Sequence, residues 1–247
     1  MSPLRIRASS IGKLMTEPKT LKEGPLSVGA RTYLRELAAQ SILGIDFEVS
    51  GKPMEKGIQC EDEAIALVGR VRGLDLAKNA ERRADDFFTG ECDVFHAPTR
   101  EGRDTKCSWS AATFPITTAD CEDKLYEYQM RVYMRLWDAP RWHVDYVLLD
   151  TPEALIGYEP LAMHIVSHIP EHMRLTTWTV ERDPAIEARM VEKVKHARDY
   201  YAQVLAEFDR THRPAGSEPP PWVEATPAAA APAAPVTTPA ALAVPTF

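Results

Sequence analysis

The chain has 247 residues and a formal net charge of −7, from 29 Lys and Arg against 36 Asp and Glu. Its composition, 45% hydrophobic and 26% charged, excludes a wholly disordered chain and a collagen-like one. The sequence contains no apolar run of the roughly 18 residues that span a bilayer and no signal-peptide core near its start, so we expect a cytoplasmic protein with no membrane partner. An acidic average does not favour nucleic acid, because phosphates are bound by Lys and Arg.

The amino-acid pattern predicts alternating helices and strands along most of the chain. Apolar residues at helical spacing predict helices over 27–43, 54–68, 122–137 and 184–210. Strand-forming runs predict strands over 87–95, 103–108, 142–149 and 175–180. The polar loop over 96–102 joins the first two strands as a hairpin, and Asp183 followed by Pro184 marks the start of the last helix. This order predicts an α/β (α+β) core, a central mixed sheet flanked by helices.

Proline is concentrated at the C-terminal end, where residues 214–247 hold nine of the 20 prolines together with eleven alanines. Proline removes backbone donors, and few bulky apolar groups remain to offset the entropy of ordering the chain. We therefore predict a folded domain over residues 1–213 and a disordered Ala/Pro-rich tail over 214–247. The tail is either inert or a tether or docking strand for a partner.

Several carboxylates fall where the pattern calls for apolar residues. Glu61 lies within the apolar stripe of the second helix, and Asp93 interrupts an apolar strand. Period two places Asp104 and Lys106 on one face of the next strand, and the hairpin can bring Asp93 beside them. Converging carboxylates raise each other's pKa unless a cation joins them, and oxygen ligands suit Mg²⁺ or Mn²⁺. Taken one at a time, these motifs also fit a partly exposed helical Glu and a surface ion pair.

Further candidates come from the third helix, the N-terminal segment and an aromatic residue. Gln129 lies in the middle of an apolar stripe, where an amide either orients an acid, a metal-bound water or a phosphate, or is a buried structural residue. Trp109 follows the second hairpin strand and either stacks on an unpaired base or packs in the core. Residues 5–23 are a phosphate-contact region or a solvated segment, with the candidates Arg5, Arg7, Ser9 and Lys13.

Cysteine and histidine give no metal motif. No two of the four cysteines have CxxC spacing, and without an export signal we expect reduced thiols. His164, His168 and His172 recur at four-residue spacing, but Pro170 interrupts the run. We therefore expect these histidines to be structural.

The order of these residues resembles the PD-(D/E)XK nuclease core, and most closely the lambda-exonuclease (YqaJ-like, viral recombinase) family. The family's Gly-x-Gln-x-Glu helix is similar to Gly57–Glu61, and its acid about ten residues before acid-x-Lys-Cys is similar to Asp93 before Asp104–Cys107. Its Tyr-x-x-Gln helix resembles Tyr126–Gln129. Its segment with a 5′-phosphate-binding Ser resembles Ile6–Ser9, so the likeness spans about residues 5–137.

Three departures from the family pattern matter for the site. The acid before the lysine, Asp104, is a Glu in most members. The family's Pro-Asp-Gly turn is absent, which leaves the geometry around Asp93 open. The family's phosphate-binding Arg lies several residues before the Ser, and Arg5 or Arg7 would have to replace it. Dependence on a 5′ end, and the identity of that Arg, therefore stay open.

The resemblance implies metal-dependent hydrolysis of phosphodiester bonds. Lys106 would orient or activate the attacking water, and Gln129 would support that water or an acid. Two Mg²⁺ or Mn²⁺ ions would polarise the phosphate and stabilise the leaving oxygen. The residues that would hold them are Asp93, Asp104, Thr105 through its carbonyl, and Glu61.

The resemblance further implies 5′-to-3′ digestion of one strand of linear duplex DNA in phage-type recombination. The same likeness implies a homotrimer around the DNA, a single-strand annealing protein as partner and a location in the host cytoplasm. The expected DNA contacts are Arg5, Arg7, Ser9, Lys13 and Trp109.

Three alternatives stay open: an endonuclease of the same fold, a Cas4-like nuclease, and a non-catalytic DNA-binding adaptor. Cas4-like proteins usually carry an N-terminal Cys and a C-terminal Cys cluster, neither of which occurs here. An inactive adaptor would have no reason to keep three acids and a lysine at nuclease spacing.

Overall fold

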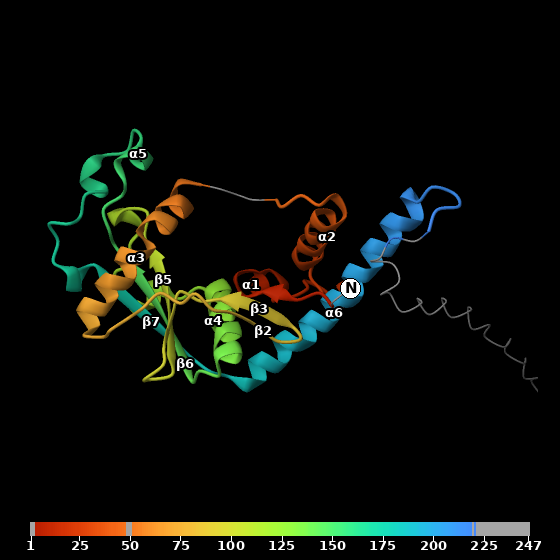
Figure 1. The fold of residues 1–247 in the computed structure, drawn as a ribbon, viewed down its shortest axis with the longest axis horizontal. Helices are drawn as coiled ribbons and strands as arrows, with labels where there is room; N and C mark the ends of the chain where they lie inside the picture. The colour runs from red at the N-terminus through yellow and green to blue at the C-terminus, as the bar shows by residue number, and fades with distance from the viewer. Residues whose placement is uncertain (1–2, 48–50, 219, 221–247) are drawn as a thin grey trace, which may run out of the picture.

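The computed structural model describes residues 3–47, 51–218 and 220 (Figure 1). Most of the predicted tail, residues 214–247, lies outside the described residues. The strands are β1 (Ile6–Arg7), β2 (Arg82–Ala84), β3 (Phe88–Glu91), β4 (Val94–His96), β5 (Glu101–Cys107), β6 (Arg141–Val147) and β7 (Leu175–Glu181). The α-helices are α1 (Ile11–Leu14), α2 (Val28–Leu43), α3 (Lys52–Arg72), α4 (Lys124–Trp137), α5 (Glu153–Ile156) and α6 (Pro184–His212).

The strands form two sheets in the described part of the chain. A four-stranded mixed sheet has the order β4-β5-β6-β7, in which β5 is antiparallel to β4 and parallel to β6. A three-stranded sheet has the order β1-β3-β2, with β1 parallel to β3. Helix α4 packs on strands of both sheets, and the long α6 runs from β7 past α4 to α2 (Figure 1). This mixed architecture with flanking helices confirms the predicted fold class.

Helix starts follow the caps that the sequence contains. The Ser27 side chain accepts a hydrogen bond from Ala30 N, and the Asp183 side chain accepts from Ala185 N and Ile186 N. Side-chain acceptors of this kind satisfy the free N–H groups of a first helical turn. Of the helices in the described residues, none combines the length and the hydropathy needed to cross a membrane.

The predicted strand over 87–95 is wrong in one respect, because it is two strands in two different sheets. Strand β3 ends at Glu91 and β4 begins at Val94, so Asp93 lies in the break. A Cβ at Gly90 would lie 2.8 Å from Tyr133 Cε1, so the glycine lets Tyr133 reach the end of β3. There the Tyr133 hydroxyl donates to the Glu91 carbonyl over 2.9 Å. The break brings Asp93 to β5 instead of aligning it along a strand.

The predicted apolar face of α3 also needs a correction. Ile65 and Val68 are buried as expected, but Ile58 is 67% exposed and Lys56 is fully buried. The Lys56 ammonium donates to three main-chain carbonyls, of Ser108 at 2.8 Å, Trp109 at 3.0 Å and Leu149 at 2.8 Å. These carbonyls lie just beyond the ends of β5 and β6. The first half of α3 is therefore fixed to the sheet by a charged group, and Ile58 faces a pocket.

Candidate active site

A cavity of about 760 Å³ lies between the first half of α3, the end of β5 and the start of α4. Four residues singled out from the sequence as metal or catalytic groups line it, and Trp109 lines it as well. These four are Glu61, Asp93, Thr105 and Lys106. The other two, Asp104 and Gln129, are buried beside Lys106 and Tyr133. The fold thus brings six residues from four segments to one place: α3, the break before β4, β5 and α4.

The carboxylate of Asp93 is fixed by the strand that follows it. Its Oδ2 accepts hydrogen bonds from the Thr105 backbone N at 2.7 Å and from the Thr105 hydroxyl at 3.0 Å. Burial raises the pKa of Asp93 to about 6, and the neighbouring Asp104 adds to this rise. Two close carboxylates therefore give the site an excess of negative charge that a cation would relieve.

Asp104 and Lys106 form an ion pair on β5. The Asp104 side chain is almost wholly buried, and its Oδ1 accepts from Gln129 Nε2 at 3.4 Å. Burial alone would lower the pKa of Lys106, but Asp104 and Asp93 raise it well above its usual value. The Lys106 ammonium also lies 4.7 Å from the centre of the Tyr126 ring, within the range of a cation–π contact. Lys106 is therefore a protonated side chain, fixed by Asp104 and Tyr126, that lines the pocket.

The acids of this pocket have the chemistry that a hard divalent cation requires. The Oδ2 atom of Asp104 is buried, and the described residue that it pairs with is Lys106. The carboxylates of Asp104 and Asp93 and the Thr105 carbonyl supply the hard oxygen ligands that such a cation binds. These residues fit Mg²⁺ or Mn²⁺.

The third acid, Glu61, is directed to another partner. Its Oε2 lies 2.7 Å from the Lys78 ammonium, which also lies 3.5 Å from Asp62 Oδ1. Among the described residues, no group of three or more acidic, His or Cys side chains is assembled to bind a metal. Glu61 lines the same pocket as Asp93, and one of its two carboxylate oxygens is paired with Lys78.

Sequence reasoning missed Lys56, Lys78 and Tyr133. The sequence predicts an exposed Lys56 because lysine is rarely buried. Its three carbonyl partners come from other segments and have no signal in the hydrophobic pattern of the helix. Lys78 lies 17 residues from Glu61, outside any predicted element. Tyr133 belongs to the predicted helix, four residues after Gln129, a spacing that places both side chains on one helix face.

The predicted DNA-binding residues of the N-terminal segment do not line this pocket. Strand β1 lies beside β3, with Arg7 paired to Thr89, and the 3-10 helix η1 (Ala8–Ser10) and α1 follow. These residues are exposed, and the Lys13 ammonium lies 5.0 Å from the Tyr33 ring centre. The four residues are Arg5, Arg7, Ser9 and Lys13. Arg7 lies in β1, Ser9 in η1 and Lys13 in α1, and the three basic side chains give this exposed N-terminal segment its positive charge.

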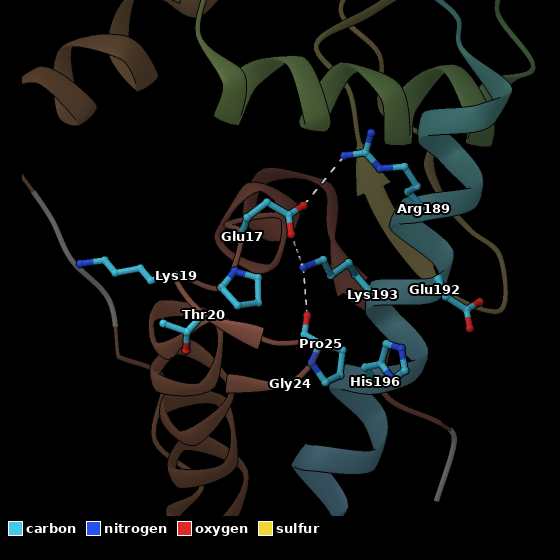
Figure 2. Close-up of a pocket in the computed structure, with 10 residues that line it drawn as sticks. Glu17, Lys19, Thr20, Gly24, Pro25, Arg189, Glu192, Lys193 and His196 are labelled. Atoms are coloured by element: carbon cyan, nitrogen blue, oxygen red, sulfur yellow. Dashed lines mark hydrogen bonds and ion pairs between the residues drawn. The ribbon is translucent and has the colours of Figure 1, made fainter. Parts of the chain in front are cut away.

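A second cavity, of about 630 Å³, lies between residues 17–25 and α6 (Figure 2). The Lys193 ammonium donates there to Glu17 Oε2 at 3.2 Å and to the Pro25 carbonyl at 3.0 Å. Arg189 lies 3.9 Å from the same carboxylate. Because two of its basic groups are engaged and it contains none of the predicted site residues, this cavity is a weaker candidate for catalysis.

Solved structures of exonucleases are similar to this fold. A phage-related exonuclease from Haemophilus somnus 129PT is 36% identical with a TM-score of 0.79, over 83% of this chain and 97% of that chain. The alkaline exonuclease LHK-Exo from Laribacter hongkongensis is 21% identical with a TM-score of 0.58, over 85% and 92% of the two chains. Its complex with dAMP is 20% identical with a TM-score of 0.60, over 84% and 92%. The LHK-Exo likeness supports the fold alone.

No protein-family model and no curated protein matches the sequence. More than a third of the residues aligned with the Haemophilus enzyme are identical, and the alignment extends over nearly all of that chain. The chain therefore belongs to the lambda-exonuclease (YqaJ-like) family of phage-related exonucleases, within the PD-(D/E)XK nucleases.

Proposed function

We propose that this protein is an exonuclease that requires Mg²⁺ and digests one strand of linear duplex DNA from 5′ to 3′. The observation that carries the proposal is the pocket lined by Asp93 and Lys106, with the buried Asp104 paired to Lys106 behind it. The name of the phage-related relative supports exonuclease activity, and LHK-Exo, which shares the fold, has been solved with dAMP, a nucleotide of the kind that DNA digestion releases.

In the proposed mechanism, Asp93, Asp104 and the Thr105 carbonyl would hold one cation, and Glu61 would hold a second. A bound divalent cation would supply Lewis-acid chemistry there, polarising the scissile phosphate and stabilising the leaving oxygen. Lys106 orients the attacking water and stabilises the negative charge that develops during attack. The sixth residue, Gln129, fixes the orientation of the Asp104 carboxylate.

The basic N-terminal segment binds the phosphates of the DNA strand in this proposal, and Arg5 or Arg7 contacts its 5′ end. Trp109 stacks on an unpaired base at the pocket. Binding of a divalent cation offsets part of the negative charge of the chain near the scissile phosphate. The cellular setting that we propose is phage-type recombination in the host cytoplasm, with a single-strand annealing protein as partner and a homotrimer as the active assembly.

A digestion assay with end-labelled DNA tests the activity. A linear 5′-phosphorylated duplex, labelled at the 5′ or the 3′ end of one strand, is incubated with Mg²⁺, with Mn²⁺ or with EDTA. We expect early release of the 5′ label, no release in EDTA, and a loss of at least about 100-fold in rate for Lys106→Ala. Lys195→Ala, which removes an exposed lysine of α6, serves as the matched control.

Other results would favour the alternatives. Equal cleavage of closed circular DNA would identify an endonuclease. No release of nucleotide by the wild-type protein, or undiminished release by Lys106→Ala, would favour a DNA-binding adaptor. Early release of the 3′ label would reverse the proposed polarity, and light scattering of the wild-type protein measures whether it is a trimer.

A further inference from the structure

The Trp109 indole at the wall of the catalytic pocket is hydrogen-bonded by a residue far along the chain. Its Nε1–H donates to the carboxylate of Glu159, which has both oxygens at 3.1 Å. Glu159 lies between α5 and the 3-10 helix η5 (Leu161–Met163), in the excursion that connects β6 to β7. The pocket wall is thus shared between the end of β5 and this excursion.

Glu159 is in turn held from the interior of the protein. The Nε2 atom of His164 lies 3.2 Å from Glu159 Oε2, and because a carboxylate only accepts, this nitrogen carries the proton. His164 is fully buried, and its Nδ1 lies 3.0 Å from the Thr151 hydroxyl. That hydroxyl donates to the Trp109 carbonyl at 3.0 Å. Glu159 thus contacts the ring of Trp109 and Thr151 contacts its backbone carbonyl, and His164 lies between Glu159 and Thr151.

The bond between Trp109 and Glu159 is not needed to satisfy a buried group. The Glu159 side chain is 42% exposed, so water can reach this carboxylate, and Trp109 is itself only partly buried. Among the described residues, buried polar atoms without any hydrogen-bond partner include the indole nitrogens of Trp137 and Trp142. Trp109 at the pocket therefore has a hydrogen-bond partner for its indole N–H, whereas these two buried indoles have none among the described residues.

We propose that Glu159 is a positioning residue that holds the Trp109 indole in the orientation that stacks on a DNA base. The proposal rests on the function proposed above, in which Trp109 contacts DNA. A freely rotating side chain loses entropy when a ligand immobilises it, which weakens binding by about 2- to 10-fold. Glu159 and His164 impose that order before DNA arrives.

Steady-state digestion of the linear duplex tests the proposal through a pair of variants. Trp109→Phe keeps an aromatic ring but removes the N–H group, and Glu159→Ala removes its acceptor. We expect each variant to raise KM by about 2- to 10-fold with kcat unchanged, because stacking acts equally on bound substrate and transition state. The double variant should match the single ones, since both remove one interaction.

Two further variants separate positioning from charge and from loop stability. Glu159→Gln removes the negative charge but keeps an oxygen that accepts from the indole, so we expect KM at or below the wild-type value. Glu171→Gln removes a charge from the same excursion, where Glu171 pairs with Arg70, and should leave KM and kcat unchanged. Thermal melting of each variant confirms that the fold is intact.

The outcomes distinguish this proposal from the function on which it rests. If Trp109→Ala raises KM but Glu159→Ala does not, Glu159 does not position the indole, and the exonuclease function stands. If the effects of Trp109→Phe and Glu159→Ala multiply in the double variant, Glu159 acts by another route and the proposal fails. If Trp109→Ala changes nothing while Lys106→Ala abolishes digestion, the stacking role is wrong and the nuclease remains. A wild-type protein that digests no DNA defeats both.

Discussion

Gln129 of α4 donates from Nε2 to Oδ1 of Asp104 on β5, over 3.4 Å. The same amide donates to the Tyr133 hydroxyl at 3.1 Å, and that hydroxyl donates to the Glu91 carbonyl at the end of β3. One chain of hydrogen bonds thus joins a proposed metal ligand to the strand end that precedes Asp93. Groups behind metal ligands orient them, and their removal typically costs about 10- to 100-fold in metal affinity or activity.

We therefore expect Gln129→Leu to lower digestion at subsaturating Mg²⁺ by about 10-fold or more. Leucine has a similar volume, so the packing of α4 is largely kept while Asp104 loses its amide partner. The measurement is the rate of nucleotide release as a function of Mg²⁺ concentration. Gln203→Leu, at an exposed position on α6, is the control. An unchanged Mg²⁺ dependence in Gln129→Leu would show that the amide does not orient the acid.

The ion pair between Glu61 and Lys78 gives a prediction of the opposite sign. Lys78 competes with a cation for the Glu61 carboxylate, so Lys78→Gln should lower the Mg²⁺ concentration at half-maximal rate. Both side chains are partly exposed, and such pairs are weak, so the expected decrease is at most about fivefold.

The control for this variant is Arg70→Gln, which breaks an ion pair with Glu63 farther along the same helix. It should leave the Mg²⁺ dependence unchanged. A higher Mg²⁺ requirement in Lys78→Gln would mean that the lysine supports the site and does not compete for it.

Removal of the C-terminal segment should leave the enzyme active. Helix α6 ends at His212, and the Arg213 N–H still donates to the Asp209 carbonyl. A chain that ends at Arg213 therefore keeps every helix and strand of the described residues. We expect its digestion rate and melting temperature to equal those of the full chain. A large drop in rate would show that residues 214–247 contribute to the folded unit.

The sequence predicted those parts of the fold that depend on local chemistry. Ser27 and Asp183 act as helix caps through contacts within three residues of themselves, and the short loop between β4 and β5 returns one strand directly onto the next. The convergence of Asp93 with Asp104 and Lys106 could be anticipated because hairpin pairing and period two are both short-range rules. Local patterns therefore placed most of the site.

Features that depend on distant segments could not be predicted in this way. The break between β3 and β4 accompanies the approach of Tyr133, which comes from a helix about 40 residues later. The pairing of Glu61 with Lys78 depends on the path of the loop after α3. The exposure of Ile58 follows from a pocket that has no local signal, so periodicity alone assigned it to the core.

The contribution of Lys56 to stability tests how helix α3 is attached to the sheet at the site. Its ammonium is fully buried and donates to the carbonyls of Ser108, Trp109 and Leu149, which fixes the helix that carries Glu61 to the strand that carries Asp104. Lys56→Met keeps the aliphatic stem but leaves these carbonyls without that donor, so urea unfolding should show a loss of about 3 kcal/mol. Lys195→Met on the exposed face of α6 should change stability by less than about 0.5 kcal/mol. Equal stabilities of the two variants would show that the buried ammonium contributes no more than a surface lysine, because water would then have to satisfy the three carbonyls equally well.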